Sequence, residues 1–147
     1  MITIKNSQRT FKVSTNKLKK SAELILKELG YDGFDLGIWL TTNNTIRSYN
    51  KEYRKRDRAT DILSFAYHQL KPGQTIPVKT DDDKNLGDLI ISLEFVNGLL
   101  PLYNVSLQER LNILLIHGIC HLLGYSHYDE ENDKLMSTLE KKLAKKL

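Results

Sequence analysis

Four short segments rich in apolar residues are predicted to be β-strands. They are expected at Ile2–Ile4, Phe34–Leu40, Ile62–Tyr67 and Leu86–Ser92. Apolar residues alternate with other residues in the first two of them, as in strands with one buried face. Residues 68–84 carry two prolines and three consecutive aspartates, which predicts a mobile surface loop between the last two strands.

Apolar residues recur at helical spacing in the other segments, which predicts five helices. The first is expected to begin at Ser14 or Thr15 and to end at Gly30, the second to begin near Thr42, and the third to run from Ser92 to before Pro101. The apolar residues at helical spacing in the first helix are Leu18, Ala22, Ile25, Leu26 and Leu29, and those on one side of the second are Ile46, Tyr49 and Tyr53.

The last two helices carry the clearest end signals. Ser106 and Glu109 form the sequence of a capping box, in which each side chain bonds the other residue's backbone amide. From Leu111 to Leu123 the only polar side chains are Asn112, His117 and His121, so this helix should be buried on most sides. Asp129 is the expected N-cap of the last helix, whose predicted buried residues are Leu135, Met136, Leu139 and Leu143.

The order of these elements predicts an α+β fold. A small mixed four-stranded sheet should be covered by about five helices, with the histidine-bearing helix central. A chain of 147 residues is large enough to bury a core without disulfides, so residues 1–147 are expected to form one domain.

Composition indicates an ordinary soluble protein, with 40% hydrophobic and 27% charged residues. The single cysteine, Cys120, excludes an internal disulfide framework. No signal-peptide pattern and no run of membrane-spanning length is found, so a cytoplasmic location without a membrane partner is expected. The net charge of +4 is compatible with an anionic partner.

Positive charge is concentrated between residues 47 and 58. Six basic residues lie there against two acidic ones, and four of the six are arginines: Arg47, Lys51, Arg54, Lys55, Arg56 and Arg58. Arginine's planar fork suits phosphate oxygens, so phosphate contact is a candidate role for this cluster. The lysines at 141, 142, 145 and 146 fit a solvated helix face better.

Three of the four histidines follow the spacing H-x-x-x-H-x-x-G-x-x-H, as His117, His121 and His127. Residues four apart lie on the same helix face, so His117 and His121 can hold one ion. Gly124 permits a turn that brings His127 back to the same point. Three imidazoles leave one position of a tetrahedral ion open, which is typical of a catalytic metal site.

The alternative for a histidine on an apolar helix is a core imidazole with a hydrogen-bond partner. Two histidines on a buried face need polar partners where few exist, and one metal ion satisfies both. Zinc suits an all-imidazole site best, although nickel, manganese, cobalt and iron also accept imidazole. Cys120 is not expected to be a ligand because it points away from His121, and His68 is expected to be merely exposed.

The histidine spacing equals that of metzincin proteases except at one position. Those enzymes carry a glutamate directly after the first histidine as general base for the zinc-bound water. Gly118 occupies this position here and has no side chain to take a proton. A protease of that class is therefore disfavoured.

Three blocks of sequence resemble the YbeY family of bacterial metal-dependent endoribonucleases. They are residues 117–127, HGICHLLGYSH; residues 50–65, NKEYRKRDRATDILSF; and residues 86–92, LGDLIIS. The family typically has leucine where this chain has Cys120 and aspartate where it has Ser126. The first is a core substitution, and the second is expected to loosen the support of the metal site.

The resemblance implies a zincin-like fold and a function. The expected activity is single-strand-specific RNA cleavage in 16S rRNA 3′-end maturation and ribosome quality control, in the cytoplasm and with the small ribosomal subunit and assembly factors as partners. It implies that His117, His121 and His127 bind one divalent ion, most simply Zn²⁺, and that Arg54 is the catalytic substrate-binding residue. The role of Asp88, in orienting a ligand or in structure, stays open.

Two other functions remain as alternatives. The histidine spacing is compatible with a metallohydrolase of another substrate, such as peptide, although Gly118 opposes it. A non-catalytic ribosome-assembly factor could use the metal mainly to hold its fold.

Overall fold

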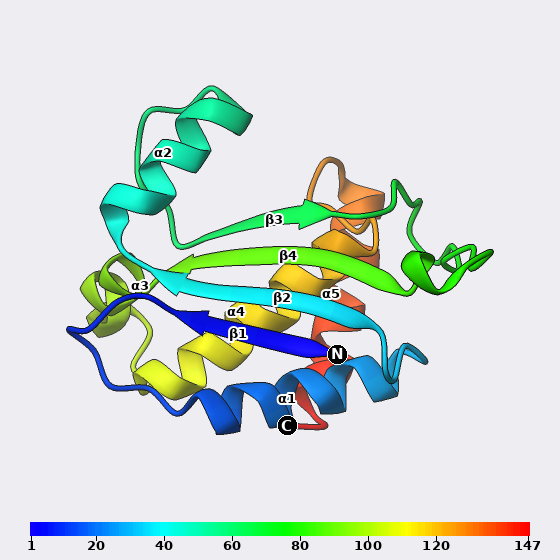
Figure 1. Ribbon diagram of the computed structural model, residues 1–147, viewed down its shortest axis with the longest axis horizontal. Coiled ribbons are helices and arrows are strands. Elements are labelled where there is room, and N and C mark those ends of the chain that lie inside the picture. The colour runs from blue at the N-terminus through cyan, green and yellow to red at the C-terminus, as the bar shows by residue number, and fades with distance from the viewer.

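The computed structural model describes residues 1–147, which form a four-stranded mixed sheet and five α-helices (Figure 1). The strands lie in the order β1-β2-β4-β3. β1 and β4 both pair with β2 in parallel, whereas β3 pairs antiparallel with β4. Their bounds are β1 Ile2–Asn6, β2 Asp35–Thr41, β3 Ile62–Ala66 and β4 Asn85–Ser92. The predicted α+β class and mixed sheet are confirmed.

All five predicted helices form. They are α1 Thr15–Glu28, α2 Asn43–Arg54, α3 Leu93–Leu99, α4 Leu107–Leu122 and α5 Glu130–Ala144, with 3₁₀ turns η1 at Asp81–Asp83 and η2 at Leu100–Leu102. Each α-helix begins at a polar N-cap whose side chain accepts a hydrogen bond from a backbone N–H of the first turn. These caps are Ser14, Thr42, Ser92, Ser106 and Asp129, and Ser106 forms the predicted capping box with Glu109.

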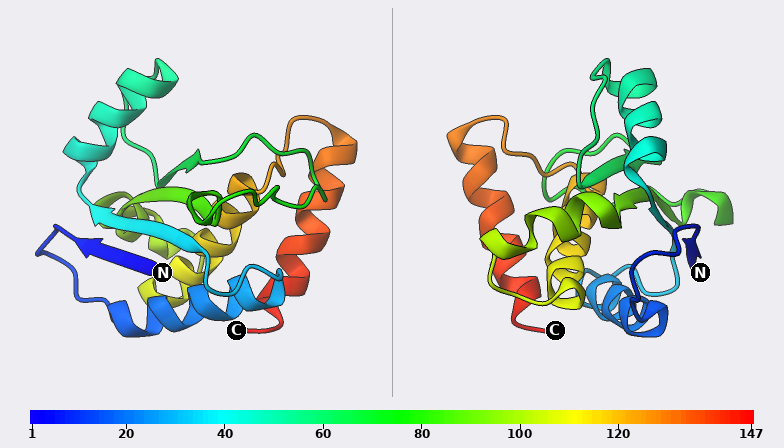
Figure 2. Two further views of the ribbon diagram at one scale, coloured as in Figure 1. Left: turned by 45° about the vertical axis from the view of Figure 1, so that its right-hand side comes forward. Right: turned by 90° about the vertical axis from the view of Figure 1, so that its left-hand side faces the viewer.

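The helices are distributed unevenly over the sheet. α1, α4 and α5 lie on one face, and α2 rises from the other (Figure 2). α4 contacts β3 and β4 above it and both α1 and α5 beside it. The predicted central position of α4 is therefore confirmed, and its C-terminal end reaches the surface beside β3.

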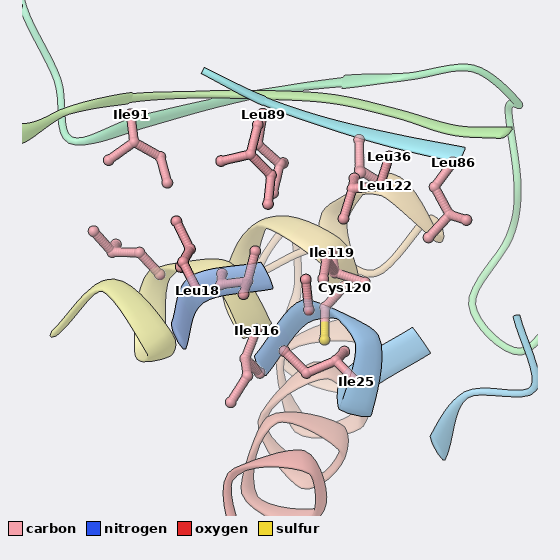
Figure 3. Close-up of a cluster of buried hydrophobic side chains, with 14 of the residues drawn as sticks. Leu18, Ile25, Leu36, Leu86, Leu89, Ile91, Ile116, Ile119, Cys120 and Leu122 are labelled. Carbon is pink, nitrogen blue, oxygen red and sulfur yellow. The ribbon is translucent and has the colours of Figure 1, made fainter. Parts of the chain in front are cut away.

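The main core fills the space between the sheet and these three helices. Leu89 and Ile91 of β4 point from the sheet toward α4, and Ile116 lies on the side of α4 that faces away from the sheet (Figure 3). Cys120 lies inside this cluster, and burial raises the pKa of its thiol to about 12. The thiolate form that binds metals is thus suppressed, as expected for a cysteine that serves as a small apolar side chain.

Two sequence predictions need correction. Leu135 is 47% exposed, whereas its neighbour Met136 is fully buried, because adjacent positions differ by about 100° around a helix and Met136 lies on the side of α5 that packs into the core. The segment 68–84 is not simply a surface loop. Ile76 is buried in the main core and Asp81–Asp83 forms a 3₁₀ turn, so the segment is packed against the domain.

No helix combines the length and the apolar character needed to cross a lipid bilayer.

Candidate metal centre

The last two turns of α4 carry two of the candidate ligands. His117 and His121 lie one helical turn apart, and their rings meet edge to face with centroids 4.4 Å apart. Their Nε2 atoms face each other at 3.0 Å. The predicted convergence of the two imidazoles is therefore present.

Gly124 turns the chain out of α4. Its φ of +94° is a conformation that L-residues with a Cβ rarely adopt, and its amide bonds the carbonyl of His121. A Cβ there would lie 2.2 Å from the carbonyl oxygen of Leu70. The turn brings the ring of His127 to 5.5 Å from that of His117 and 6.2 Å from that of His121, measured between centroids.

Each of the three imidazoles has an oxygen partner on its Nδ1. His117 Nδ1 lies 3.1 Å from Glu140 Oε2, and His121 Nδ1 lies 2.9 Å from the carbonyl oxygen of Tyr125. His127 Nδ1 bonds the carboxylate of Asp133. A carbonyl or an ionised carboxylate can only accept, so each Nδ1 carries the hydrogen and each Nε2 keeps its lone pair.

This protonation pattern fits a metal ion. Two Nε2 lone pairs that face each other at 3.0 Å repel unless a cation or a proton lies between them. Burial and the neighbouring His117 lower the pKa of His121, against the opposing effect of its bond to the Tyr125 carbonyl. Tetrahedral zinc places ligand nitrogens roughly 3.3 Å apart, given Zn–N bonds of about 2.0–2.1 Å. The donors present are thus suited to a divalent ion.

A second donor set overlaps the first. One potential ligand atom from each of His117, His127 and Glu140 lies within 4.8 Å of the others. Glu140 could join this set through Oε1, which lies 3.9 Å from Nε2 of His127, while Oε2 keeps its contact with Nδ1 of His117. We favour the three Nε2 atoms because ligand histidines almost always donate their other ring N–H to a carboxylate or carbonyl.

Three groups at this centre were not predicted from the sequence: the carboxylates of Glu140 and Asp133, and the carbonyl of Tyr125. The two acids were detectable in principle. Asp133 lies three residues before Met136 and Glu140 lies four residues after it, so both share one face of α5 with this methionine. A backbone carbonyl leaves no such signal in the sequence.

Arg54 shares a cleft with two of the histidines. The cleft has a volume of about 560 Å³ and is lined by Arg54, His117 and His121 among others. The Arg54 guanidinium donates to the carbonyl oxygen of Ser64 at 2.7 Å and lies 5.0 Å from the ring centre of Phe65. β3 therefore holds the arginine at the mouth of the cleft, where its remaining N–H groups are exposed.

The other residues of interest lie elsewhere. Asp88 is on the face of the sheet opposite α4, beside Gly37, and so does not contact a ligand histidine. Gly118 faces the sheet, and a Cβ there would come within 2.8 Å of Ile62 and Leu89. His68 is half-buried and its Nε2 lies 2.8 Å from the carbonyl oxygen of Asp83, so the prediction that it is merely exposed is wrong.

Comparison with known proteins identifies the family of this chain. A sequence model of the family described as Endoribonuclease YbeY matches residues 3–147. The chain belongs to the YbeY family.

Relatives named Endoribonuclease YbeY include one from Listeria welshimeri, 39% identical, covering 88% of each chain. A human relative of the same name is 35% identical over 95% of this chain and 84% of its own. The solution structure of TM1509 from Thermotoga maritima superposes with a TM-score of 0.64 at 26% identity, covering 99% of this chain and 88% of that chain. The predicted membership of the YbeY family and the predicted fold are confirmed.

Proposed function

We propose that this protein is a metal-dependent, single-strand-specific endoribonuclease. The observation that carries the proposal is the cleft that Arg54 shares with His117 and His121, beside which His127 completes a set of three Nδ1-bonded imidazoles. His117, His121 and His127 would hold one divalent ion, most simply Zn²⁺, through Nε2. The ion would polarise a phosphoryl oxygen or activate a water molecule.

Arg54 would bind the phosphate at the cut. Its bond to Ser64 and its contact with the Phe65 ring fix the plane of the guanidinium while leaving other N–H donors free. Negative charge grows on phosphoryl oxygens in the transition state, so a fixed cationic donor stabilises that state more than the substrate.

Replacement of Arg54 should separate catalysis from metal binding. Arg54→Ala is expected to lower kcat/KM on single-stranded RNA by about 100- to 1000-fold, the usual effect of losing one preorganised donor. Arg54→Lys should retain only part of the rate, because lysine keeps the positive charge but lacks the planar guanidinium that can bind two phosphate oxygens at once. Arg110→Ala is the matched control, since Arg110 stacks on Tyr103 at 3.7 Å far from the cleft. Cleavage equal to that of the parent in Arg54→Ala would contradict the assigned role.

A second, smaller cleft extends the basic surface. It has a volume of about 360 Å³, shares Arg54, Ile62 and Leu63 with the first cleft and is also lined by Arg56 and Arg58. We infer that the RNA backbone continues into it.

Salt dependence tests this path. The logarithm of the association constant for single-stranded RNA falls linearly with the logarithm of the salt concentration. The slope is expected to become shallower by about 0.7 for each protein–phosphate contact that is removed. Arg56→Ala and Arg58→Ala should each show such a change, with little effect on metal binding. Lys20→Ala on α1 serves as the control for loss of one exposed charge. Unchanged slopes in both arginine variants would place the RNA elsewhere.

The biological substrate we propose is the 16S rRNA precursor near its 3′ end, with a part in ribosome quality control. The partners would be the small ribosomal subunit and its assembly factors, in the cytoplasm. This proposal is supported by the family and by the basic cleft.

The deciding experiment compares parent, His117→Ala and Arg54→Ala on single-stranded and duplex RNA, with folding checked by circular dichroism. Loss of cleavage in both folded variants, with single strands preferred by the parent, is the expected result. Undiminished cleavage in His117→Ala would indicate a contaminating nuclease and favour the assembly factor. Chelator-sensitive turnover of casein would favour the peptide hydrolase instead.

A further inference from the structure

One face of α5 combines two acids with two buried apolar residues. Asp133, Met136, Glu140 and Leu143 are separated by three, four and three residues, which places them on one side of the helix. Met136 and Leu143 are buried in the main core, and α5 packs along α4. The two apolar residues therefore hold this face of α5, with its carboxylates, against the histidines of the metal centre.

Each carboxylate contacts a different histidine. Glu140 Oε2 accepts from Nδ1 of His117 at 3.1 Å, and Asp133 accepts from Nδ1 of His127. Glu140 is only 24% exposed, so water competes weakly for its oxygens. Only His121 takes its Nδ1 partner from the main chain, at Tyr125. α5 thus supplies two of the three acceptors around the site.

We propose that Asp133 and Glu140 are positioning residues that set the affinity of the centre for its divalent ion. By accepting from Nδ1 they fix the tautomer and the ring orientation of His127 and His117, so that both Nε2 lone pairs point to one place. A carboxylate partner also makes an imidazole a better donor to the ion. The inference rests on the proposed function in one respect, namely that the three histidines hold the ion.

Glu140 has a competing role that must be distinguished. Its Oε1 lies 3.9 Å from Nε2 of His127, which is compatible with direct ligation together with His117 and His127. A ligand and a positioning residue differ in what their loss changes. Loss of a ligand changes the donor set of the ion, whereas loss of a positioning residue changes the affinity and leaves the donor set intact.

The test uses the full chain stripped of metal and then titrated with Co²⁺ and Zn²⁺ against a chromophoric chelator. Glu140→Ala and Asp133→Ala are expected to bind 10- to 100-fold more weakly than the parent, the usual effect of removing such a partner. Glu140→Gln and Asp133→Asn keep an oxygen acceptor and should recover most of the affinity. Glu131→Ala, an exposed acid in the first turn of α5 with no contact to the histidines, should match the parent.

The visible absorption spectrum of bound Co²⁺ gives the second readout. It should keep its shape in all the variants, because the three nitrogens remain. A changed spectrum in Glu140→Ala and Glu140→Gln would make Glu140 a ligand and overturn the assignment. Equal affinities in parent and alanine variants would overturn it as well. Thermal unfolding of the metal-free proteins identifies any variant that fails to fold, and the amide variants then decide.

Failure of the proposed function has a different signature. A parent that binds Co²⁺ but cleaves no RNA would sink the nuclease proposal and leave the positioning role standing. If the parent binds Co²⁺ and cleaves RNA, and the alanine variants bind the ion with equal affinity, the positioning role alone would be overturned. A parent that binds neither ion would overturn both.

Discussion

His121→Ala is expected to abolish useful metal binding, with an affinity loss larger than the roughly 100-fold upper range for residues that only support a ligand. Burial and the neighbouring His117 lower the pKa of His121, so this imidazole is neutral and ready to bind at neutral pH. Cleavage of single-stranded RNA should fall with the bound metal. Competition against a chelator measures the first effect, and a gel assay measures the second.

The fourth histidine provides the matched control. His68 bonds the carbonyl of Asp83 and belongs to neither donor set of the metal centre. His68→Ala should therefore bind metal and cleave RNA as the parent does, even if the segment 68–84 loosens. Metal binding retained in His121→Ala would mean that the ion uses Glu140 in its place.

Gly124→Ala should cost about 3 kcal/mol or more of unfolding free energy. Left-handed backbone conformations cost a residue with a Cβ roughly 1–2 kcal/mol, and overpacking typically adds about 1–3 kcal/mol. Both apply here, because φ is +94° and the new Cβ would lie 2.2 Å from the Leu70 carbonyl oxygen. Relief requires the 68–84 segment or the turn bearing His127 to move. Chemical denaturation measures the loss, and metal affinity should fall in parallel.

Substitutions at two other glycines distinguish backbone strain from overpacking as the cause of the lost stability. Gly30 has φ of +84° with open space around it, so Gly30→Ala should show the backbone strain alone. Gly98 lies in α3 without positive φ or a close neighbour, so Gly98→Ala should be neutral or slightly stabilising. A Gly124→Ala protein no less stable than Gly30→Ala would show that the approach to Leu70 does not constrain this turn.

Local signals in the sequence predicted most of the fold. Polar N-caps and hydrophobic periodicity gave the five helices within a residue or two, because both depend on neighbours within one or two turns. Leu135 was misassigned because it adjoins Met136, and only the packing of α5 on α4 decides which of the two is buried. Burial of Ile76 likewise depends on contacts with core residues that are distant in the sequence, so it could not be predicted from the proline-containing segment alone.

The residues of the metal centre likewise divide into those that local sequence signals predicted and those that depend on how the helices pack. His117, His121 and His127 lie within eleven residues, so helix geometry and one glycine were enough to predict that their rings come close together. Asp133 and Glu140 arrive from another helix, and their contact depends on how that helix crosses α4. Ser126 was expected to weaken the support of the site, yet every Nδ1 has an oxygen partner without it.

The central claim is that one divalent ion is held by three imidazoles at the end of α4. Anomalous diffraction at the absorption edge of the bound metal, on crystals of protein purified without added ions, tests it most directly. A single peak bonded to Nε2 of His117, His121 and His127 is expected, at about 2.0–2.1 Å for zinc. A peak bonded to the Glu140 carboxylate in place of His121, or a peak remote from these rings, would contradict it.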